Sequence, residues 1–459
     1  MRFNLRSRAP ALAAALLAAL PLGLFGQAAP DSITVDEAVR AALASNLAVR
    51  SMEVESRIKK RASDFSFNKF LPSVSLSGTV LQLNQVSPVM VATAPLPTGT
   101  YITPSRTNLA LGLTIQEVFN ATFFGLMDQA AIDYQRSLIT KAQAERGMAA
   151  SVKKIFYQLI VQDQAIALTR ARLDSAKERL RQAEVLFKLG QGTELNYSYA
   201  KMNVESLIPD LRSMESAKAA GLAQFQEALG FDSNPAMKLD GSLELGTVAV
   251  DGLPISEDDR FEVRQSRQTE KQLESALKIQ RYALLPSLIL QYRADPMLNG
   301  PGEKNPMTGK TTDIFDTANW SQSSGAISLT LSWSLDALLP ASSIRVAKAE
   351  VQDRLALARE ATAQALRAGR DDAAIQLRAI RDSIDKIGNL TSAAEASARV
   401  YELTNAAYQL GTGRILDLQD AEVSLQGMRI QLLNERLKLA SLVFDFEAKY
   451  QSLEIGAGK

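Results

Sequence analysis

Two carboxylates, Asp417 and Asp420, lie three residues apart, shortly after the stretch Gly411-Thr412-Gly413. On a helix this spacing places both side chains on one face. The simplest interpretation is an acidic first turn, which the helix dipole favours. If several copies of the chain met there, converging carboxylates would instead attract cations. The residues alone leave both interpretations open.

The residue types exclude several other kinds of chemistry. The 459 residues include no Cys and no His, so thiolate metal sites, disulfides and the commonest general base are absent. The net charge is +1, without the clustered basic excess of a nucleic-acid footprint. No phosphate-binding loop, metal-ligand cluster or nucleophile constellation is present. We therefore predict no enzyme, no cofactor, no metal site and no nucleic-acid partner.

The N-terminus has the pattern of a secretory signal peptide over residues 1–28. Arg2, Arg6 and Arg8 precede an uncharged apolar run, and small residues allow cleavage after Ala28. An uncleaved anchor is the alternative, although the run is short for a bilayer span and Pro21 interrupts it. No later stretch is long and apolar enough for a transmembrane helix, so a membrane-spanning part would have to be β.

Two long helices are predicted. One precedes the stretch that carries the acids, and the other precedes a related stretch earlier in the chain. Each carries an apolar residue every seven positions, which predicts coiled-coil packing: Val152, Leu159, Ile166, Leu173, Leu180, Phe187, and Ala373, Ile380, Ile387, Ala394, Tyr401, Tyr408. The first helix (about 120–189) ends at Gly190 and Gly192, and the second (about 342–410) ends at Gly411 and Gly413. Return helices are predicted over 194–229, with a kink at Pro209, and over 415–450.

Four segments alternate apolar with small polar residues, which predicts strands. They span about 73–83, 107–116, 286–293 and 326–335, and long loops rich in Pro and Gly join them in pairs. Entry helices are predicted from Thr34, which opens a capping box with Glu37, to about Phe70, and from Asp259 to Leu285. The pairs Asp371-Asp372 and Asp258-Asp259 are predicted to be solvated charge.

The chain repeats its plan. Phe-Leu-Pro-Ser at 70–73 matches Leu-Leu-Pro-Ser at 284–287, and the heptad rows and glycine pairs superimpose at an offset of 221. Residues 29–230 and 258–459 are thus predicted to be two structural repeats, each containing a helix, a β-hairpin, a long helix, a tip and a return helix, joined by a linker over 231–257.

Four apolar-faced strands in an exported chain indicate a membrane β-barrel, because a bilayer leaves no strand edge unpaired. Four strands cannot close alone, whereas three chains would supply twelve and leave a water-filled bore. Tyr101, Tyr292, Trp320 and Trp333 would suit aromatic girdles. The alternative is a soluble sheet that covers a core on one face.

This plan resembles the TolC-type outer-membrane efflux channel family over the whole mature chain. The residues that carry the resemblance are the duplicated plan, the Leu-Pro-Ser entries, the opening TVDEAV at 34–39 and the tip from Tyr408 to Ala421. The resemblance implies a mainly α fold with a small β part. It also implies a homotrimer whose helices form a tunnel, and docking of a periplasmic adaptor served by an inner-membrane transporter.

The family's gate residues can be carried over by position. The resemblance implies a carboxylate ring from Asp417 and Asp420 and a closing role for Tyr408. The family's Arg position is Gly413 here, with Arg414 next to it, and the first tip has Asn196 and Tyr199 in place of the acids. Adaptor docking is expected at Gly190, Gly192, Thr193, Gly411, Thr412 and Gly413, where glycine leaves the backbone uncovered.

The predicted function is a passive outer-membrane export channel with a long periplasmic extension. A non-transporting coiled-coil scaffold or adhesin of the envelope is the alternative, but such a scaffold has no need for alternating uncharged strands. An envelope hydrolase would need a convergent acid, base and nucleophile. The sequence does not identify the exported substrate.

Overall fold

The structure is a computed structural model that describes residues 30–91, 100–241, 256–303, 310–321, 325–335 and 339–450. The predicted signal peptide and most of the predicted linker lie outside these residues. The chain forms two compact units. The tip unit comprises residues up to Glu55, Ile139–Arg264 and Ala365–Lys459, and the sheet unit comprises Ser56–Leu138 and Gln265–Gln364. Each unit therefore combines segments of both predicted repeats.

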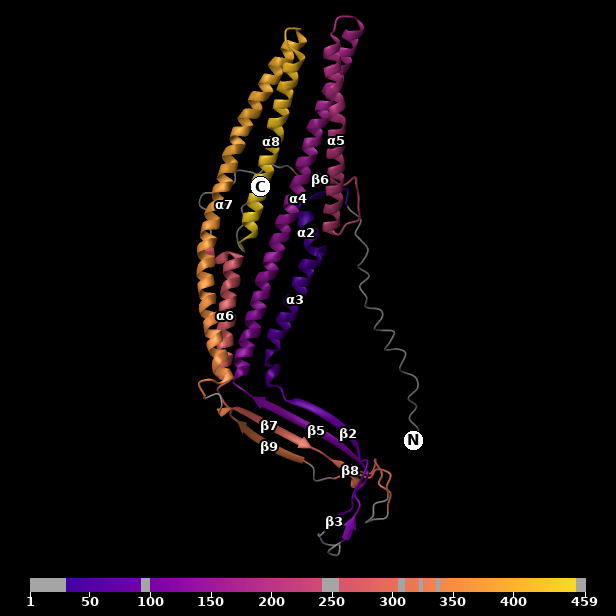
Figure 1. The fold of residues 1–459 in the computed structure, drawn as a ribbon, viewed down its shortest axis with the longest axis vertical. Coiled ribbons are helices and arrows are strands. Elements are labelled where there is room, and N and C mark those ends of the chain that lie inside the picture. The colour runs from indigo at the N-terminus through magenta and orange to yellow at the C-terminus, as the bar shows by residue number, and fades with distance from the viewer. Residues whose placement is uncertain are drawn as a thin grey trace. The chain divides into compact units, whose positions relative to one another are not determined.

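The sheet unit contains the predicted strands as one antiparallel sheet in the order β2-β5-β7-β9 (Figure 1). The strands are β2 (Ser73–Gln82), β5 (Thr107–Phe119), β7 (Ser287–Ala294) and β9 (Gly325–Ser332). Strand β5 runs three residues beyond its predicted end because Glu117, Val118 and Phe119 still pair with β7. The predicted loops also contain β3 (Val89–Val91), β4 (Thr100–Ile102) and β8 (Met297–Asn299), which pairs with β5.

The register of the sheet separates an apolar face from a polar face. Leu76 pairs with Leu113, Ile115 with Tyr292, and Leu290 with Leu329, so most apolar residues of the four strands share one side. Ser75, Thr114 and Gln291 lie on the other side. Within the paired registers, Glu117 is the one charged residue on the apolar face. Its carboxylate oxygens have no hydrogen-bond partner among the described residues.

Both outer strands of this sheet are fully exposed. Every residue of β2 and of β9 is exposed, including Leu76 (79%) and Ile327 (76%). Neither strand has a second neighbour among the described strands, so one hydrogen-bonding edge of each is open. Exposed apolar edge strands are the part of a sheet that most readily pairs with another chain.

The sheet unit also contains parts of α3 (Leu47–Asp64), α4 (Thr122–Lys188), α6 (Phe261–Tyr282) and α7 (Ser343–Gln409). Ser275 Oγ donates a hydrogen bond to the carbonyl of Gly125 at 2.9 Å, which joins α6 to α4. The unit also holds the short 3-10 helices η1 (Ser66–Phe70) and η3 (Thr317–Asn319). Among the described residues, no helix combines the length and the apolar character needed to cross a membrane.

Four long helices of the tip unit lie side by side in the order α7, α8, α4, α5 (Figure 1). Helices α4 (Thr122–Lys188) and α7 (Ser343–Gln409) extend beyond this unit, whereas α5 (Glu194–Leu229) and α8 (Ile415–Ala448) are contained in it. Pro209 lies inside α5 without ending it. The mainly α fold with a small β part and duplicated repeats is therefore confirmed.

The predicted heptad rows supply the contacts between these helices. Leu173 of α4 packs with Val204 and Leu207 of α5, and Ile380 of α7 packs with Leu439 and Val443 of α8. A third cluster joins α4 to α8 through Ala150, Val161, Ala440 and Phe444. Tyr157 of α4 stacks on Phe444 with ring centroids 5.7 Å apart. This α4–α8 contact connects the two halves of the chain.

The prediction of one continuous helix from Thr34 to about Phe70 is wrong. The helix breaks at Asn46 into α2 (Val35–Ser45) and α3 (Leu47–Asp64). Asn46 has an extended backbone, and its side-chain oxygen accepts from the N–H of Ala48 at 2.9 Å. Asparagine is a preferred helix N-cap, so the break has a local cause. The predicted capping box of Thr34 and Glu37 is present. Ahead of it, β1 (Ser32–Thr34) pairs in parallel with β6 (Lys238–Asp240).

The prediction that Asp372 is merely solvated is wrong. Its carboxylate pairs with Arg260 at 2.9 Å and Lys449 at 2.8 Å, and Gln376 Nε2 donates to it at 2.9 Å. Arg260 follows the 3-10 helix η2 (Glu257–Asp259), whose Asp259 pairs with Arg264. Three chain segments that are distant in sequence meet at Asp372, which is why sequence spacing does not show the site.

Candidate functional site

The two helical tips have the same turn, with the same pattern of backbone hydrogen bonds. In the first tip, the N–H of Gly190 donates to the carbonyl of Phe187, and the N–H groups of Gln191 and Gly192 donate to that of Leu186. In the second tip, Gly411 donates to Tyr408, and Thr412 and Gly413 donate to Ala407. All six bonds are 2.9–3.0 Å long. They satisfy the free carbonyls at the ends of α4 and α7.

Glycine is needed for a different reason at each of its two positions in this turn. Gly190 and Gly411 have φ of +72° and +75°, a left-handed conformation that other residues rarely adopt. Gly413 needs space instead, because a Cβ there would lie 2.9 Å from the backbone nitrogen of Tyr408. At Gly192 the corresponding Cβ would lie 3.1 Å from the Phe187 nitrogen.

We expect Gly413→Ala to destabilise the second tip by about 1–2 kcal/mol, because the new Cβ would press against backbone that cannot move freely. Gly427→Ala is the matched control on α8, where a Cβ would meet nothing within 4 Å. There we expect a gain of about 0.5–1 kcal/mol from the better helix propensity of alanine. Thermal unfolding midpoints measure both, and equal shifts of the same sign would contradict the assignment.

The tips differ where the return helices begin. Thr193 caps α5, since its hydroxyl accepts from the N–H of Asn196 at 3.2 Å. Arg414 stands at the same position before α8 and makes no side-chain cap bond. An acidic side chain, Asp417, lies in the first turn of α8 and favours the helix dipole there. Glu194 lies in the first turn of α5 in the same way, so both return helices begin with an acid and the tips differ in the cap residue.

Asp417 and Asp420 are both exposed, and neither has an ion-pair partner in the part of the chain that the structure describes. Arg414 is also exposed, whereas Tyr408 is half-buried beside Ile415 and Leu416. Among the described residues, no hydrogen bond joins Tyr408 to Arg414. The structure therefore presents the two carboxylates to solvent and keeps Tyr408 in a packing role.

Ile415 connects the two tips. It is 5% exposed and packs in one cluster with Ala183 of α4 and Ala200 of α5. Within the first tip, Phe187 stacks on Tyr197 with ring centroids 5.6 Å apart and planes 7° apart. The tips are therefore packed against each other at their base, while their turns are exposed.

A buried ion pair that was not predicted from the sequence lies next to the candidate gate. Arg179 of α4 pairs with Glu422 of α8, and their side chains are only 11% and 5% exposed. Glu422 lies two residues after Asp420. The pair lies on the seam where α4 meets α8, and each residue alone reads as surface charge. Only the pairing of these two helices reveals it.

A second buried acid lies farther along α8. Glu435 is 6% exposed and accepts from Ser383 Oγ at 2.9 Å and Lys386 Nζ at 2.7 Å, both on α7. Burial by itself raises the pKa of Glu435, but the bonds from Lys386, Ser383 and Lys438 outweigh it and lower the pKa. At Asp372, burial likewise raises the pKa, but Lys449, Gln376 and Arg260 lower it overall.

We expect these two acids to make the tip unit sensitive to acid. A carboxyl whose pKa is lower in the folded state stabilises the fold above its unfolded pKa of about 4. That contribution is lost as pH falls through the lower, folded pKa. Unfolding midpoints measured between pH 7 and pH 3 should stay level at first and then fall. Asp372→Asn should lower the midpoint at pH 7 and make the acid loss shallower, whereas the exposed neighbour Asp371→Asn should do neither.

A family match and a set of solved structures both agree with the fold described above. Residues 255–442 match the protein family described as "Outer membrane efflux protein". This range covers most of the second repeat and includes Asp417 and Asp420. No curated protein sequence matches the chain.

Solved structures show the same fold over nearly the whole chain. A membrane protein from Pseudomonas aeruginosa is similar with a TM-score of 0.72 at 16% identity, covering 90% of this chain and 93% of that one. The outer membrane protein VceC from Vibrio cholerae gives 0.69 at 14%, covering 90% and 94%. The CmeC outer membrane channel of Campylobacter jejuni gives 0.71 at 15%, covering 92% and 87%. Residues 255–442 therefore match the outer membrane efflux protein family by sequence, and the chain as a whole has the fold of these solved membrane proteins.

Proposed function

We propose that the protein is an outer-membrane efflux channel that conducts export substrates passively. The observation that carries the proposal is the β2-β5-β7-β9 sheet. It has one face that is apolar except for Glu117, an opposite face of mainly polar residues, and two open edges. Such a sheet suits a barrel wall with lipid on one side and water on the other. The CmeC structure, which shares the fold, is described as an outer membrane channel.

Closure of this barrel requires more than one copy of the chain. The four strands alternate in direction, so β9 of one copy can pair antiparallel with β2 of the next. This contact is heterologous, because different edges meet, and a heterologous contact forms a ring when its rotation closes. Three copies give twelve strands and an open bore. We therefore propose a homotrimer.

The outer helices of the tip unit support the same assembly. Helix α7, on one side of the four-helix row, exposes Ile375 (60%) and Leu403 (59%). Helix α5, on the other side, exposes Leu195 (63%) and Met202 (59%). Burial of these side chains against a neighbouring copy would remove apolar surface from water. Paired in this way, the helices of three copies would enclose a tunnel.

We place the gate at the second tip. Asp417 and Asp420 are exposed and lack ion-pair partners among the described residues, so three copies would supply six carboxylates that attract cations. Tyr408 holds the base of the tip by packing, and Arg414 is the cation nearest in sequence to the acids. The exposed turns with Gly190, Gly192, Thr193, Gly411, Thr412 and Gly413 would dock a periplasmic adaptor that is served by an inner-membrane transporter. The N-terminal signal peptide would direct export.

We expect the double substitution Asp417→Ala and Asp420→Ala to weaken block of the channel by multivalent cations by about tenfold, since the cations lose their carboxylate partners. Single-channel recordings in planar bilayers measure the block. Asp382→Ala with Asp385→Ala is the matched control, because these acids are also three apart and exposed on a helix. Unchanged block in the tip variant would refute the gate assignment.

Assembly and conduction test the proposed function itself. Outer-membrane fractions should contain a species that migrates as a trimer on unheated gels and as a monomer after heating. The purified species should form pores in planar bilayers. An envelope scaffold or adhesin would oligomerise without conducting, and a monomeric periplasmic species would refute the channel.

A further inference from the structure

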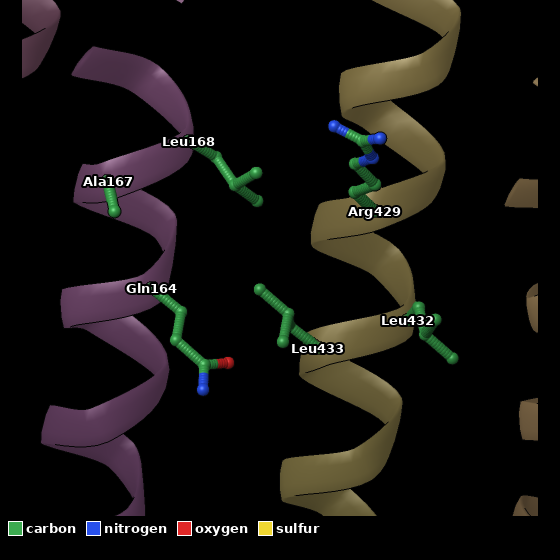
Figure 2. A pocket seen from close by; sticks show the side chains of 6 residues that line it. All are labelled: Gln164, Ala167, Leu168, Arg429, Leu432 and Leu433. Atoms are coloured by element: carbon green, nitrogen blue, oxygen red, sulfur yellow. The ribbon is translucent and has the colours of Figure 1, made fainter. Parts of the chain in front are cut away.

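A groove runs between α4 and α8 in the tip unit, away from both tips (Figure 2). Its volume is about 440 Å³, within the range of small-molecule sites. Leu168 of α4 and Leu433 of α8 point toward each other across it, and Arg429 lies beside it. Its lining comprises Gln164, Ala167, Leu168, Arg429, Leu432 and Leu433. The lining is thus apolar, with one amide and one guanidinium.

A second arginine lies at the level of Arg429. The two helices are antiparallel, and the Arg179–Glu422 pair sets their register. Seven residues from this pair, in the direction away from the tips, lie Arg172 on α4 and Arg429 on α8. The next apolar layer is formed by Leu168 and Leu433, four residues farther along each helix. Arg172 therefore belongs to the same face of α4 as Leu168 and Arg179, the face that α8 covers.

Neither arginine is neutralised in the part of the chain that the structure describes. Arg172 and Arg429 have no ion pair or hydrogen bond there, and Nε of Arg172 is buried without a partner. One heptad away, by contrast, Arg179 has its acid in Glu422. Two guanidinium groups at the same level of the seam repel each other, and the buried Nε of Arg172 without an acceptor is costly. An anion bound between the two arginines would reduce both costs.

We propose that this groove binds an amphipathic organic anion. Its acidic group would accept hydrogen bonds from Arg172 and Arg429, since guanidinium binds carboxylate, sulfonate and phosphate oxygens in a fixed geometry. Its apolar body would lie between Leu168 and Leu433, with Gln164 at the far end. The proposed ring uses the outer helices α7 and α5, so it leaves the α4–α8 groove uncovered. Binding does not depend on conduction through the channel.

The test is calorimetric titration of 2-naphthalenesulfonate into the full chain in lipid nanodiscs, with empty nanodiscs subtracted. We expect binding that weakens roughly tenfold in Arg429→Gln and again in the double variant with Arg172→Gln, because each charge-assisted bond is lost. Arg212→Gln, an exposed change of the same charge on α5, should leave binding unchanged. Leu433→Ala should weaken naphthalenesulfonate binding but not the interaction with inorganic sulfate.

Two probes separate the possible outcomes. Uncharged 2-naphthalenemethanol should bind at least tenfold more weakly than the sulfonate, and sulfate alone should bind weakly. Equal affinity for the alcohol, or no response to the arginine variants, would overturn the proposal. Sulfate binding as strong as that of naphthalenesulfonate would also overturn it, because the site would then recognise a bare anion. Folding of each variant is checked by its unheated gel mobility, which does not depend on the groove.

Discussion

Leu76→Arg is expected to abolish accumulation of the protein in the outer membrane. Leu76 lies near the middle of β2, is 79% exposed, and pairs with Leu113 on the apolar face of the sheet. If that face meets lipid, a guanidinium there costs about 2–4 kcal/mol per subunit near the bilayer midplane. A trimer would carry this cost three times.

The matched control is Ser75→Arg, one residue earlier on the same strand. Ser75 pairs with Thr114 on the opposite face, which we propose lines the bore. This variant should assemble normally, because the new side chain meets water, and its conductance should be reduced. Quantifying heat-modifiable trimer in outer-membrane fractions measures both variants. Equal loss in the two variants, or no loss in Leu76→Arg, would show that the apolar face does not contact lipid.

Arg179→Ala is expected to destabilise the tip unit by about 3–5 kcal/mol. The substitution leaves the carboxylate of Glu422, whose side chain is 5% exposed, buried without its partner. Because Glu422 follows Asp420 on α8, the loss should also loosen the start of that helix and reduce the cation block that we assign to Asp417 and Asp420. Chemical denaturation followed by circular dichroism measures the change in stability.

Two further variants separate charge pairing from other effects. Arg179→Met combined with Glu422→Leu should recover most of the stability, since apolar side chains of similar volume often replace a buried ion pair without loss. Arg181→Ala removes an exposed ion pair with Glu178 on the same helix, and we expect no measurable change there. If Arg179→Ala behaved like Arg181→Ala, the buried pair would have no structural role.

Much of the fold was predictable because its signals are local. The strand segments alternate with a period of two, the long helices carry seven-residue rows, and the turn glycines stand where φ is positive or where a Cβ would not fit. Each of these signals lies within a few residues of the feature that it specifies. Asn46 carried such a signal too, since its cap breaks the first helix, but the long apolar pattern around it favoured one continuous helix.

The missed features depend on partners far along the chain. Arg179 meets Glu422 across 243 positions, and Asp372 meets Lys449 across 77. A charged residue on a helix face has the same local pattern whether it meets water or a buried counter-ion. Its environment is decided by which helix packs against it and in what register. That choice comes from the fit of whole apolar faces rather than from the charge itself.

The tips show the same division. The sequence by itself determined that two glycine turns end two heptad helices, and that Asp417 and Asp420 follow the second turn where Asn196 and Tyr199 follow the first, because backbone conformation and helix capping are local. Only the tertiary structure decided that Asp417 and Asp420 are exposed without ion-pair partners among the described residues, while Tyr408 packs inside and Glu422 is buried against Arg179. These differences arise because the antiparallel contact of α8 with α4 turns one face of α8 toward the seam and the other toward solvent.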